Sequence, residues 1–167
     1  MTYSLKNGKD NVKFDVPDHW EVIGVAEPKI VEAIPDEKIN EAVLEALTNP
    51  IGSKSIKEQL NEDSTIAIAV DDISRHTPAH LLVEPLIDLL YEIGVKKENI
   101  RIIFALGMHR DMTKEDAEKK LGKRIASEIK WENHQMEENL MDLGKSKAGT
   151  PIQINNNFYE SDFKIAI

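Results

Sequence analysis

Ionisable side chains are concentrated in one short stretch, AVDDISRHTP at residues 69–78. The carboxylates of Asp71 and Asp72 directly follow an apolar run, and the hydroxyl of Ser74 and the guanidinium of Arg75 come next. A guanidinium can hold a carboxylate or a phosphate through two parallel hydrogen bonds. The stretch therefore carries residue types that bind small anions.

A second polar cluster follows the apolar run IRIIFAL at residues 100–106, where Gly-Met-His-Arg places His109 and Arg110 side by side. An imidazole changes its charge near neutral pH, so His109 has the chemistry of a general acid or base. Ligands of open parallel sheets bind outside the carboxyl ends of the strands. If the strands before the two clusters are neighbours, both clusters face one crevice.

Each of these residues also has an ordinary structural explanation. Asp71 or Asp72 could cap the next helix or pair with Arg75. His109 could be a hydrogen-bonded structural histidine. The functional interpretation gains weight only when the residues are taken together, because all of them fall where such folds place ligands.

The pattern around the clusters predicts an α/β fold, a Rossmann-like parallel sheet with flanking helices. The runs at 65–70 and 100–106 are continuously apolar, as in strands covered on both faces. Helices are expected at 77–94, with Thr77 as N-cap, and from the N-cap Thr113 onward. Strands alternating with helices indicate a parallel sheet. Further expected elements are a helix over 36–47 capped by Asp36, a short helix within 49–60, a helical stretch at 123–130, a strand and turn at 151–158 and a strand at 164–167.

Residues 1–26 are predicted to form a β-rich appendage to this domain. YSLKNGKDNVKFDV alternates polar and apolar residues around a hairpin turn at Asn7-Gly8. VIGVA at 22–26 is expected to be another short strand. The whole chain, 1–167, is interpreted as one N-terminal domain, and its last letters stop inside a predicted buried strand, so we expect a fragment of a larger two-domain protein.

Composition excludes several classes of protein. The chain has no cysteine, which rules out disulfides and thiolate metal sites, and its formal charge of −9 argues against binding nucleic acid. No apolar run approaches the roughly 20 residues that span a bilayer, and no secretory signal begins the chain, so a cytoplasmic protein without a membrane partner is expected. The lysine-rich segment EKKLGKR at 118–124 is interpreted as a solvated helix face.

Several segments together resemble the N-terminal part of the nickel-pincer-nucleotide-dependent lactate racemase family. They occur in the family's order, at its spacing, and over most of the chain. The matching segments are NPIGS at 49–53, DDISR at 71–75 with Thr77-Pro78, ALGMHR at 105–110 with Thr113, NH at 133–134, LGKSKAGTPIQIN at 143–155 and ESDFKIAI at 160–167.

The resemblance implies an isomerase, a racemase or epimerase of small 2-hydroxy acids that works by hydride transfer to a nickel pyridinium-3,5-bisthiocarboxylate mononucleotide. It assigns His109 as the general base that removes the hydroxyl proton. Arg75 matches a residue that contacts both cofactor and substrate, and Asp72, Ile73 and Ser74 match cofactor-binding positions, Ile73 through its backbone. The partners implied are the hydroxy acid and proteins that build the cofactor.

The chain departs from the family pattern in places. Ser74 replaces a commoner threonine, and His76 stands where the family often has proline. The family's cofactor-anchoring lysine, second catalytic histidine and nickel-ligating histidine all lie beyond the equivalent of Ile167. We therefore expect no metal ligand within this chain and no activity from the chain alone.

Two other functions stay open at this stage. A metal-dependent phosphoryl hydrolase could use Asp71 and Asp72 as carboxylate ligands. A non-catalytic domain could bind a carboxylate or a nucleotide through Arg75. The roles of His76 and His134, and the identity of the hydroxy acid, are left undecided by the sequence.

Overall fold

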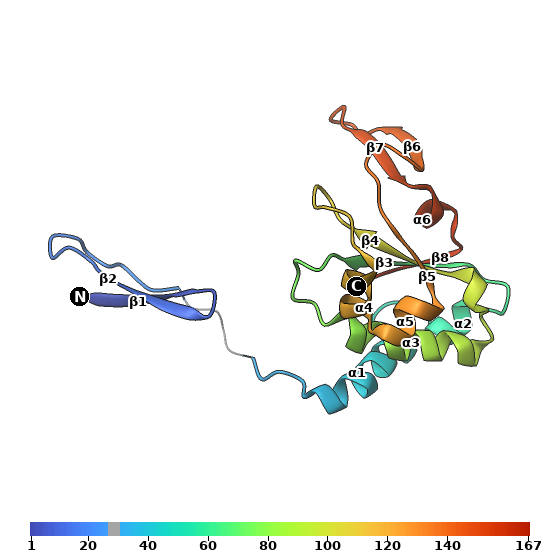
Figure 1. Cartoon of the computed structure of the whole chain (residues 1–167), viewed down its shortest axis with the longest axis horizontal. Coiled ribbons are helices and arrows are strands. Elements are labelled where there is room, and N and C mark those ends of the chain that lie inside the picture. The colour runs from blue at the N-terminus through green and yellow to red at the C-terminus, as the bar shows by residue number, and fades with distance from the viewer. Residues whose placement is uncertain (27–30) are drawn as a thin grey trace. The chain divides into compact units, whose positions relative to one another are not determined.

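The computed structural model describes residues 1–26 and 31–167. The chain divides into two compact units, residues 1–33 and 34–167, and each is treated by itself below (Figure 1). Within the described ranges, every helix is too short or too polar to cross a membrane.

The smaller unit is an antiparallel hairpin of β1 (Thr2–Asn7) and β2 (Asp10–Asp15), which confirms the predicted hairpin. The rings of Tyr3 and Phe14, partners in the ladder, stack with their centroids 6.0 Å apart. The strand predicted at 22–26 was wrong. These residues pair with no strand in the described part of the chain. Ile23 is 97% exposed, so the apolar side chains of this segment are not buried in a sheet.

The larger unit is built on a four-stranded parallel sheet with the strand order β5-β4-β3-β8. β3 and β4 are neighbours, with Asp71 opposite Ala105 at their carboxyl ends. The predicted α/β class and parallel sheet are therefore confirmed. The strands are β3 (Ile66–Asp71), β4 (Ile100–Ala105), β5 (Lys130–Asn133) and β8 (Phe163–Ala166).

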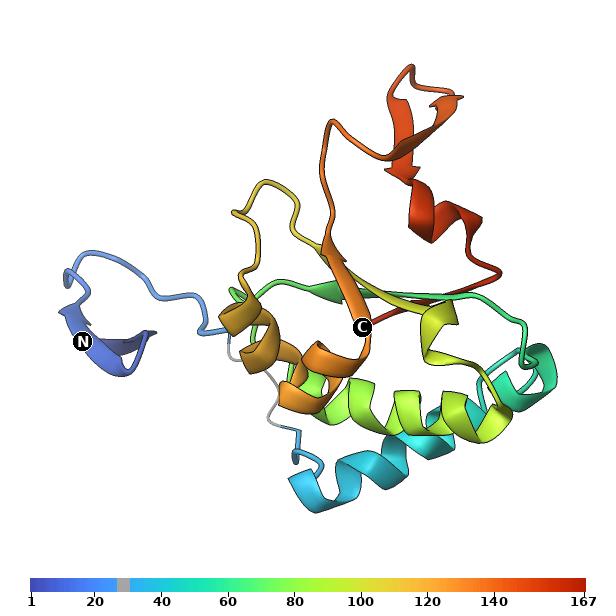
Figure 2. The same ribbon diagram turned by 45° about the vertical axis from the view of Figure 1, so that its right-hand side comes forward.

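The helices α1 to α5, whose bounds are given below, lie on one side of this sheet (Figure 1 and Figure 2). Alternate residues of β3 and β4, such as Ile68 and Phe104, join residues of the helices in one buried core. Each fully buried side chain of this size contributes roughly 1.5–3 kcal/mol to folding. The helices are α1 (Asp36–Thr48), α2 (Ile56–Gln59), α3 (Ala79–Ile93), α4 (Lys114–Leu121) and α5 (Lys123–Glu128), and a 3₁₀ turn, η1 (Lys97–Asn99), precedes β4.

The other side of the sheet faces a second hairpin, β6 (Leu140–Lys145) with β7 (Pro151–Asn155), and the short helix α6 (Asn156–Glu160). The sequence predicted a strand at β7 but missed β6. It also predicted a turn where α6 forms. The side chain of Asn155 accepts a hydrogen bond from the amide of Phe158 and so caps this helix.

Two predicted helix starts are corrected by the structure. The N-cap of α3 is Pro78 rather than Thr77, whose hydroxyl binds Asp71 instead. The N-cap of α1 is Pro35, and Asp36 lies in the first turn, where a carboxylate is still favoured by the helix dipole. Thr113 caps α4 as predicted, in a capping box with Asp116.

Candidate functional site

Two loops meet where β3 and β4 end. The Asp72 loop (residues 72–78) joins β3 to α3, and the His109 loop (residues 106–113) joins β4 to α4. Parallel neighbouring strands bring their carboxyl ends to the same edge of a sheet, so the two loops lie next to each other. The predicted neighbourhood of the two polar clusters is therefore present.

The Asp72 loop begins with a tight turn made by Asp72 itself. Its Oδ1 accepts a hydrogen bond of 2.7 Å from the amide of Ser74, and its carbonyl oxygen accepts one of 3.1 Å from the amide of Arg75. This is the local bonding that aspartate offers at turns. Asp72 is buried, at 5% exposure, although it is a carboxylate.

The His109 loop turns back at Gly107, whose φ of +57° suits glycine best. The amide of His109 donates to the carbonyl oxygen of Leu106 in the same turn. The ring is thereby placed against the neighbouring loop. His109 Nδ1 lies 2.7 Å from Asp72 Oδ2 and 3.4 Å from the hydroxyl of Ser74.

The Asp72 carboxylate fixes the tautomer of His109. Burial raises the pKa of Asp72, but hydrogen bonds from Ser74 and His109 more than offset this, and the pKa lies well below its usual range. An ionised carboxylate only accepts hydrogen bonds, so the proton of a neutral His109 ring is on Nδ1. The lone pair of Nε2 is then free to accept a proton. The His109 side chain is 51% exposed, so a substrate can reach it.

Arg75 stands apart from this group. Its amide is bonded within the turn, but in the described part of the chain its guanidinium makes no hydrogen bond or ion pair. The residue is exposed, as Ser74 is. The structure thus brings Asp72, Ser74 and His109 into contact and leaves the guanidinium available to an anion.

Partly buried contacts of Met112 connect the His109 loop to β5 and to the Asp72 loop. The side-chain amide of Asn133, the last residue of β5, accepts from the amide of Met112 and donates to its carbonyl oxygen, each at 3.1 Å. Met112 Sδ in turn lies 3.4 Å from the amide of Ile73. The backbone amide of Ile73 therefore already has a hydrogen-bond partner within the protein, the sulfur of Met112. The sequence held no signal for Met112 beyond its apolar character.

Asp71 and Lys120 form a second pair, between a partly buried carboxylate and a buried lysine. Lys120 Nζ is 2.5 Å from Asp71 Oδ1, and Lys120 is only 4% exposed. The interpretation of 118–124 as a solvated face was therefore wrong for Lys120. A signal was present, since Lys120 follows the buried Ala117 by three residues and so lies on the apolar stripe of α4. Asp71 pairs with this lysine and not with Arg75.

The other histidines near the edge are less engaged. His76 is exposed in the Asp72 loop. His134 follows β5 and donates its amide to the carbonyl oxygen of Phe104, while its buried Nδ1 has no hydrogen-bond partner among the described residues. Nowhere in 1–26 and 31–167 do three or more His, Asp or Glu side chains gather as metal ligands would.

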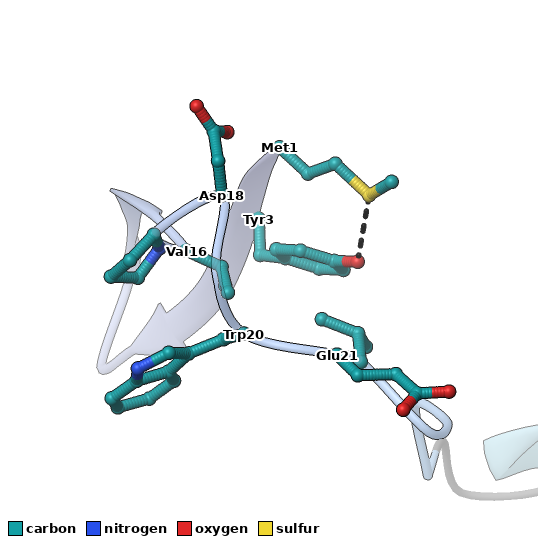
Figure 3. A pocket seen from close by; sticks show the side chains of 8 residues that line it. Met1, Tyr3, Val16, Asp18, Trp20 and Glu21 are labelled. Carbon is teal, nitrogen blue, oxygen red and sulfur yellow. Dashed lines mark hydrogen bonds between the residues drawn. The ribbon is translucent and has the colours of Figure 1, made fainter.

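A separate hollow lies within the smaller unit, between the hairpin and the residues that follow it. Figure 3 shows Met1, Tyr3 and Trp20 around this space, whose volume is about 320 Å³. Asp18 and Glu21 also line it, but none of its lining residues is a histidine, lysine or arginine. It lacks the combination of base and cation found where β3 and β4 end.

The fold and the site define a class: an α/β domain that presents an imidazole, oriented by a buried carboxylate, at the carboxyl ends of parallel strands, with an exposed arginine in the same loop as the carboxylate. Comparison with known proteins narrows this class. The model of the lactate racemase N-terminal domain family matches residues 7–167. The chain therefore belongs to the lactate racemase N-terminal domain family, as its sequence motifs implied.

Individual relatives agree with this assignment. The chain is 27% identical to the lactate racemase of Thermoanaerobacterium thermosaccharolyticum over 161 residues and 30% identical to that of Lactiplantibacillus plantarum over 128. These alignments cover 95% and 75% of this chain but only 37% and 30% of the relatives. The structure of the lactate racemase apoprotein from T. thermosaccharolyticum superposes with a TM-score of 0.79 at 26% identity, covering 99% of this chain and 38% of that one.

Proposed function

We propose that this chain is the N-terminal domain of a racemase or epimerase of small, lactate-like 2-hydroxy acids, with His109 as the general base. The observation that carries the proposal is the 2.7 Å contact between His109 Nδ1 and Asp72 Oδ2. It orients a half-exposed imidazole with its free nitrogen away from the carboxylate. Membership of the lactate racemase family supports the substrate class.

His109 would take the proton of the substrate hydroxyl at Nε2. Asp72 would stabilise the imidazolium that forms, because its carboxylate is ionised and in direct contact with the ring. The proton would be held on His109 until it is returned to the alkoxide oxygen. Arg75 would bind the substrate carboxylate, or an anionic group of the cofactor, through its planar fork.

The residues present fit the nucleotide cofactor that the family resemblance implies. The exposed hydroxyl of Ser74 and the guanidinium of Arg75, which has no partner among the described residues, suit the phosphate of a nucleotide, and Ile73 could contact it through its carbonyl oxygen. When bound, a nickel-pincer nucleotide supplies hydride acceptance and return, which no protein side chain offers. The described residues provide no cluster of ligands for the nickel itself, so the metal would need ligands from elsewhere.

The geometry is less favourable to a phosphoryl hydrolase built on Asp71 and Asp72. Asp71 is engaged by Lys120 and Thr77, whereas Asp72 is engaged by His109 and Ser74. The two carboxylates thus have separate sets of partners. Sharing a metal ion between them would require both sets of bonds to break.

The proposal is tested with a full-length protein that contains this chain, produced together with the cofactor-building proteins. Interconversion of D- and L-lactate, and of other 2-hydroxy acids, is followed by chiral chromatography. We expect His109→Ala to lower the rate about 10²–10⁴-fold, as the loss of a positioned acid or base does. His80→Ala is the matched control, because His80 is an exposed histidine on α3.

Three outcomes would contradict the proposal. A loss of less than about tenfold in His109→Ala would remove His109 from the mechanism. Binding of 2-hydroxy acids without turnover by the loaded protein would favour a non-catalytic binding domain. A magnesium-dependent phosphatase activity that Asp71→Asn abolishes would favour the hydrolase.

A further inference from the structure

The buried side chain of Lys120 contacts more than its ionic partner. Besides Asp71 Oδ1 at 2.5 Å, its Nζ donates to the carbonyl oxygens of Arg75 and Thr77, each at 3.2 Å. An ammonium group has three N–H donors, and two of them bond to these carbonyl oxygens, while the contact with Asp71 Oδ1 is an ion pair without hydrogen-bond geometry. Lys120 thereby bonds to the backbone of the Asp72 loop at two points.

These two carbonyl groups are on either side of His76, in the part of the loop that presents Arg75. The hydroxyl of Thr77 adds a hydrogen bond of 2.5 Å to Asp71 Oδ2. The loop is thus bound to the end of β3 through Asp71 and to α4 through Lys120. No other cation lies within ion-pairing distance of Asp71 in the described residues.

Helix α4 also contacts the His109 loop, at its other end. Asp116 in its first turn pairs with Arg110, the residue after His109, at 2.6 Å. Thr113 caps the same turn. A single helix of eight residues therefore connects the loop of the base with the loop of the arginine.

We propose that Lys120 is a positioning residue that sets the conformation of the Asp72 loop and so the place of Arg75 relative to His109. The part of this inference that concerns activity rests on the proposed function; the part that concerns the loop does not. A lysine at a buried helix position is unfavourable unless its charge and donors are satisfied. The charge of Lys120 neutralises Asp71, and two of its three donors hold the loop.

A double variant separates these two roles. Lys120→Met combined with Asp71→Asn removes both charges of the pair and keeps the side-chain sizes similar, while the carbonyl groups of Arg75 and Thr77 lose their donor. We expect this variant to unfold in one cooperative step in urea, at a midpoint lowered by the loss of these two hydrogen bonds. The amide of Arg75, followed by hydrogen exchange in the 167-residue chain, should exchange about tenfold faster or more.

The same substitutions in the full-length, cofactor-loaded protein should lower kcat/KM by about tenfold or more, because small displacements of a binding group are costly. Lys119→Met is the matched control, since Lys119 precedes Lys120 on α4 but is exposed. It should change neither the exchange of Arg75 nor the kinetics. An Arg75 amide that exchanges at the wild-type rate in the double variant would overturn the proposal, because Lys120 would then only neutralise Asp71.

A measurement on the unaltered chain covers the case in which the double variant does not fold. The ammonium protons of Lys120 should exchange slowly enough with water to give their own ¹H–¹⁵N signal at neutral pH, and those of Lys119 should not. Failure to detect a protected ammonium at Lys120 would overturn the proposal. A wild-type protein without racemase activity would refute the proposed function, while both exchange experiments would still decide the role of Lys120.

Discussion

At the scale of single residues, the site depends on carboxylates that are kept ionised by their neighbours. Asp72 and Asp116 each accept hydrogen bonds from groups close in the sequence and from one cationic or ionisable side chain, His109 or Arg110. Such bonding favours the charged form and lowers a carboxyl pKa. The carboxylates of Asp72 and Asp116 should therefore stay ionised over the whole range of pH in which a cell operates.

Asp116 gives a prediction about acid stability. The hydrogen bond from Arg110, with that from the amide of Thr113, lowers the pKa of Asp116 to about 2. Since the usual value is about 3.9, its contribution to stability is complete above pH 4 and is lost as the pH falls through about 2. Asp116→Asn should unfold at lower urea than the wild type at pH 7, and the difference should shrink between pH 4 and pH 2. A difference that is independent of pH would mean that the charge of Asp116 does not stabilise the fold.

At the scale of elements, the loops are held by residues of strands and helices that the sequence pattern did not single out. Asn133 ends β5 and Lys120 lies in the last turn of α4, and each bonds to the backbone of a loop from another part of the chain. Strands covered on both faces could be predicted from local pattern, as could the cap Thr113, whereas the caps predicted at Thr77 and Asp36 were wrong by one residue. The meeting of the Asp72 and His109 loops followed from the expected strand order, but the side-chain contacts of Asn133 and Lys120 with these loops could not be predicted, because no local pattern records them.

Asn133 provides the prediction at this scale. Asn133→Ala removes both bonds to Met112 and leaves its amide and carbonyl groups without partners, which should lower the free energy of unfolding by about 1–3 kcal/mol in urea titrations. Gln135→Ala is the control, since Gln135 is exposed and binds Asp111 at the surface; its effect should stay within about 0.5 kcal/mol. Equal effects of the two substitutions would show that Asn133 does not hold the His109 loop.

The errors of prediction at this scale share a cause. The apolar segment VIGVA at 22–26 predicts a short strand, yet no partner strand for it is present in the described chain. The strand β6 was missed because Gly144 and the charged Asp142 and Lys145 weaken its apolar pattern. It forms because its backbone pairs with β7. In both cases the decisive factor is the presence or absence of a partner strand.

At the scale of the whole chain, the two units differ in what stabilises them. The buried core lies in the larger unit, between Ile56 and Ile129, with partly buried residues such as Trp131 packed against it. The hairpin of the smaller unit exposes Leu5, Val12 and Phe14. A two-stranded hairpin is at best marginally stable by itself in water.

Each unit contains one of the two tryptophans, so fluorescence can follow them separately. Trp131 contacts Phe104 with ring centroids 5.6 Å apart, whereas Trp20 is 65% exposed. In Trp20→Phe, the fluorescence of Trp131 should report one cooperative transition in urea, because it belongs to the core. In Trp131→Phe, the fluorescence of Trp20 should change at lower urea or without a cooperative step, and residues 1–33 should contribute little to the stability of 34–167. Coincident transitions in the two variants would instead show that the units unfold together, in which case the hairpin would draw its stability from the larger unit.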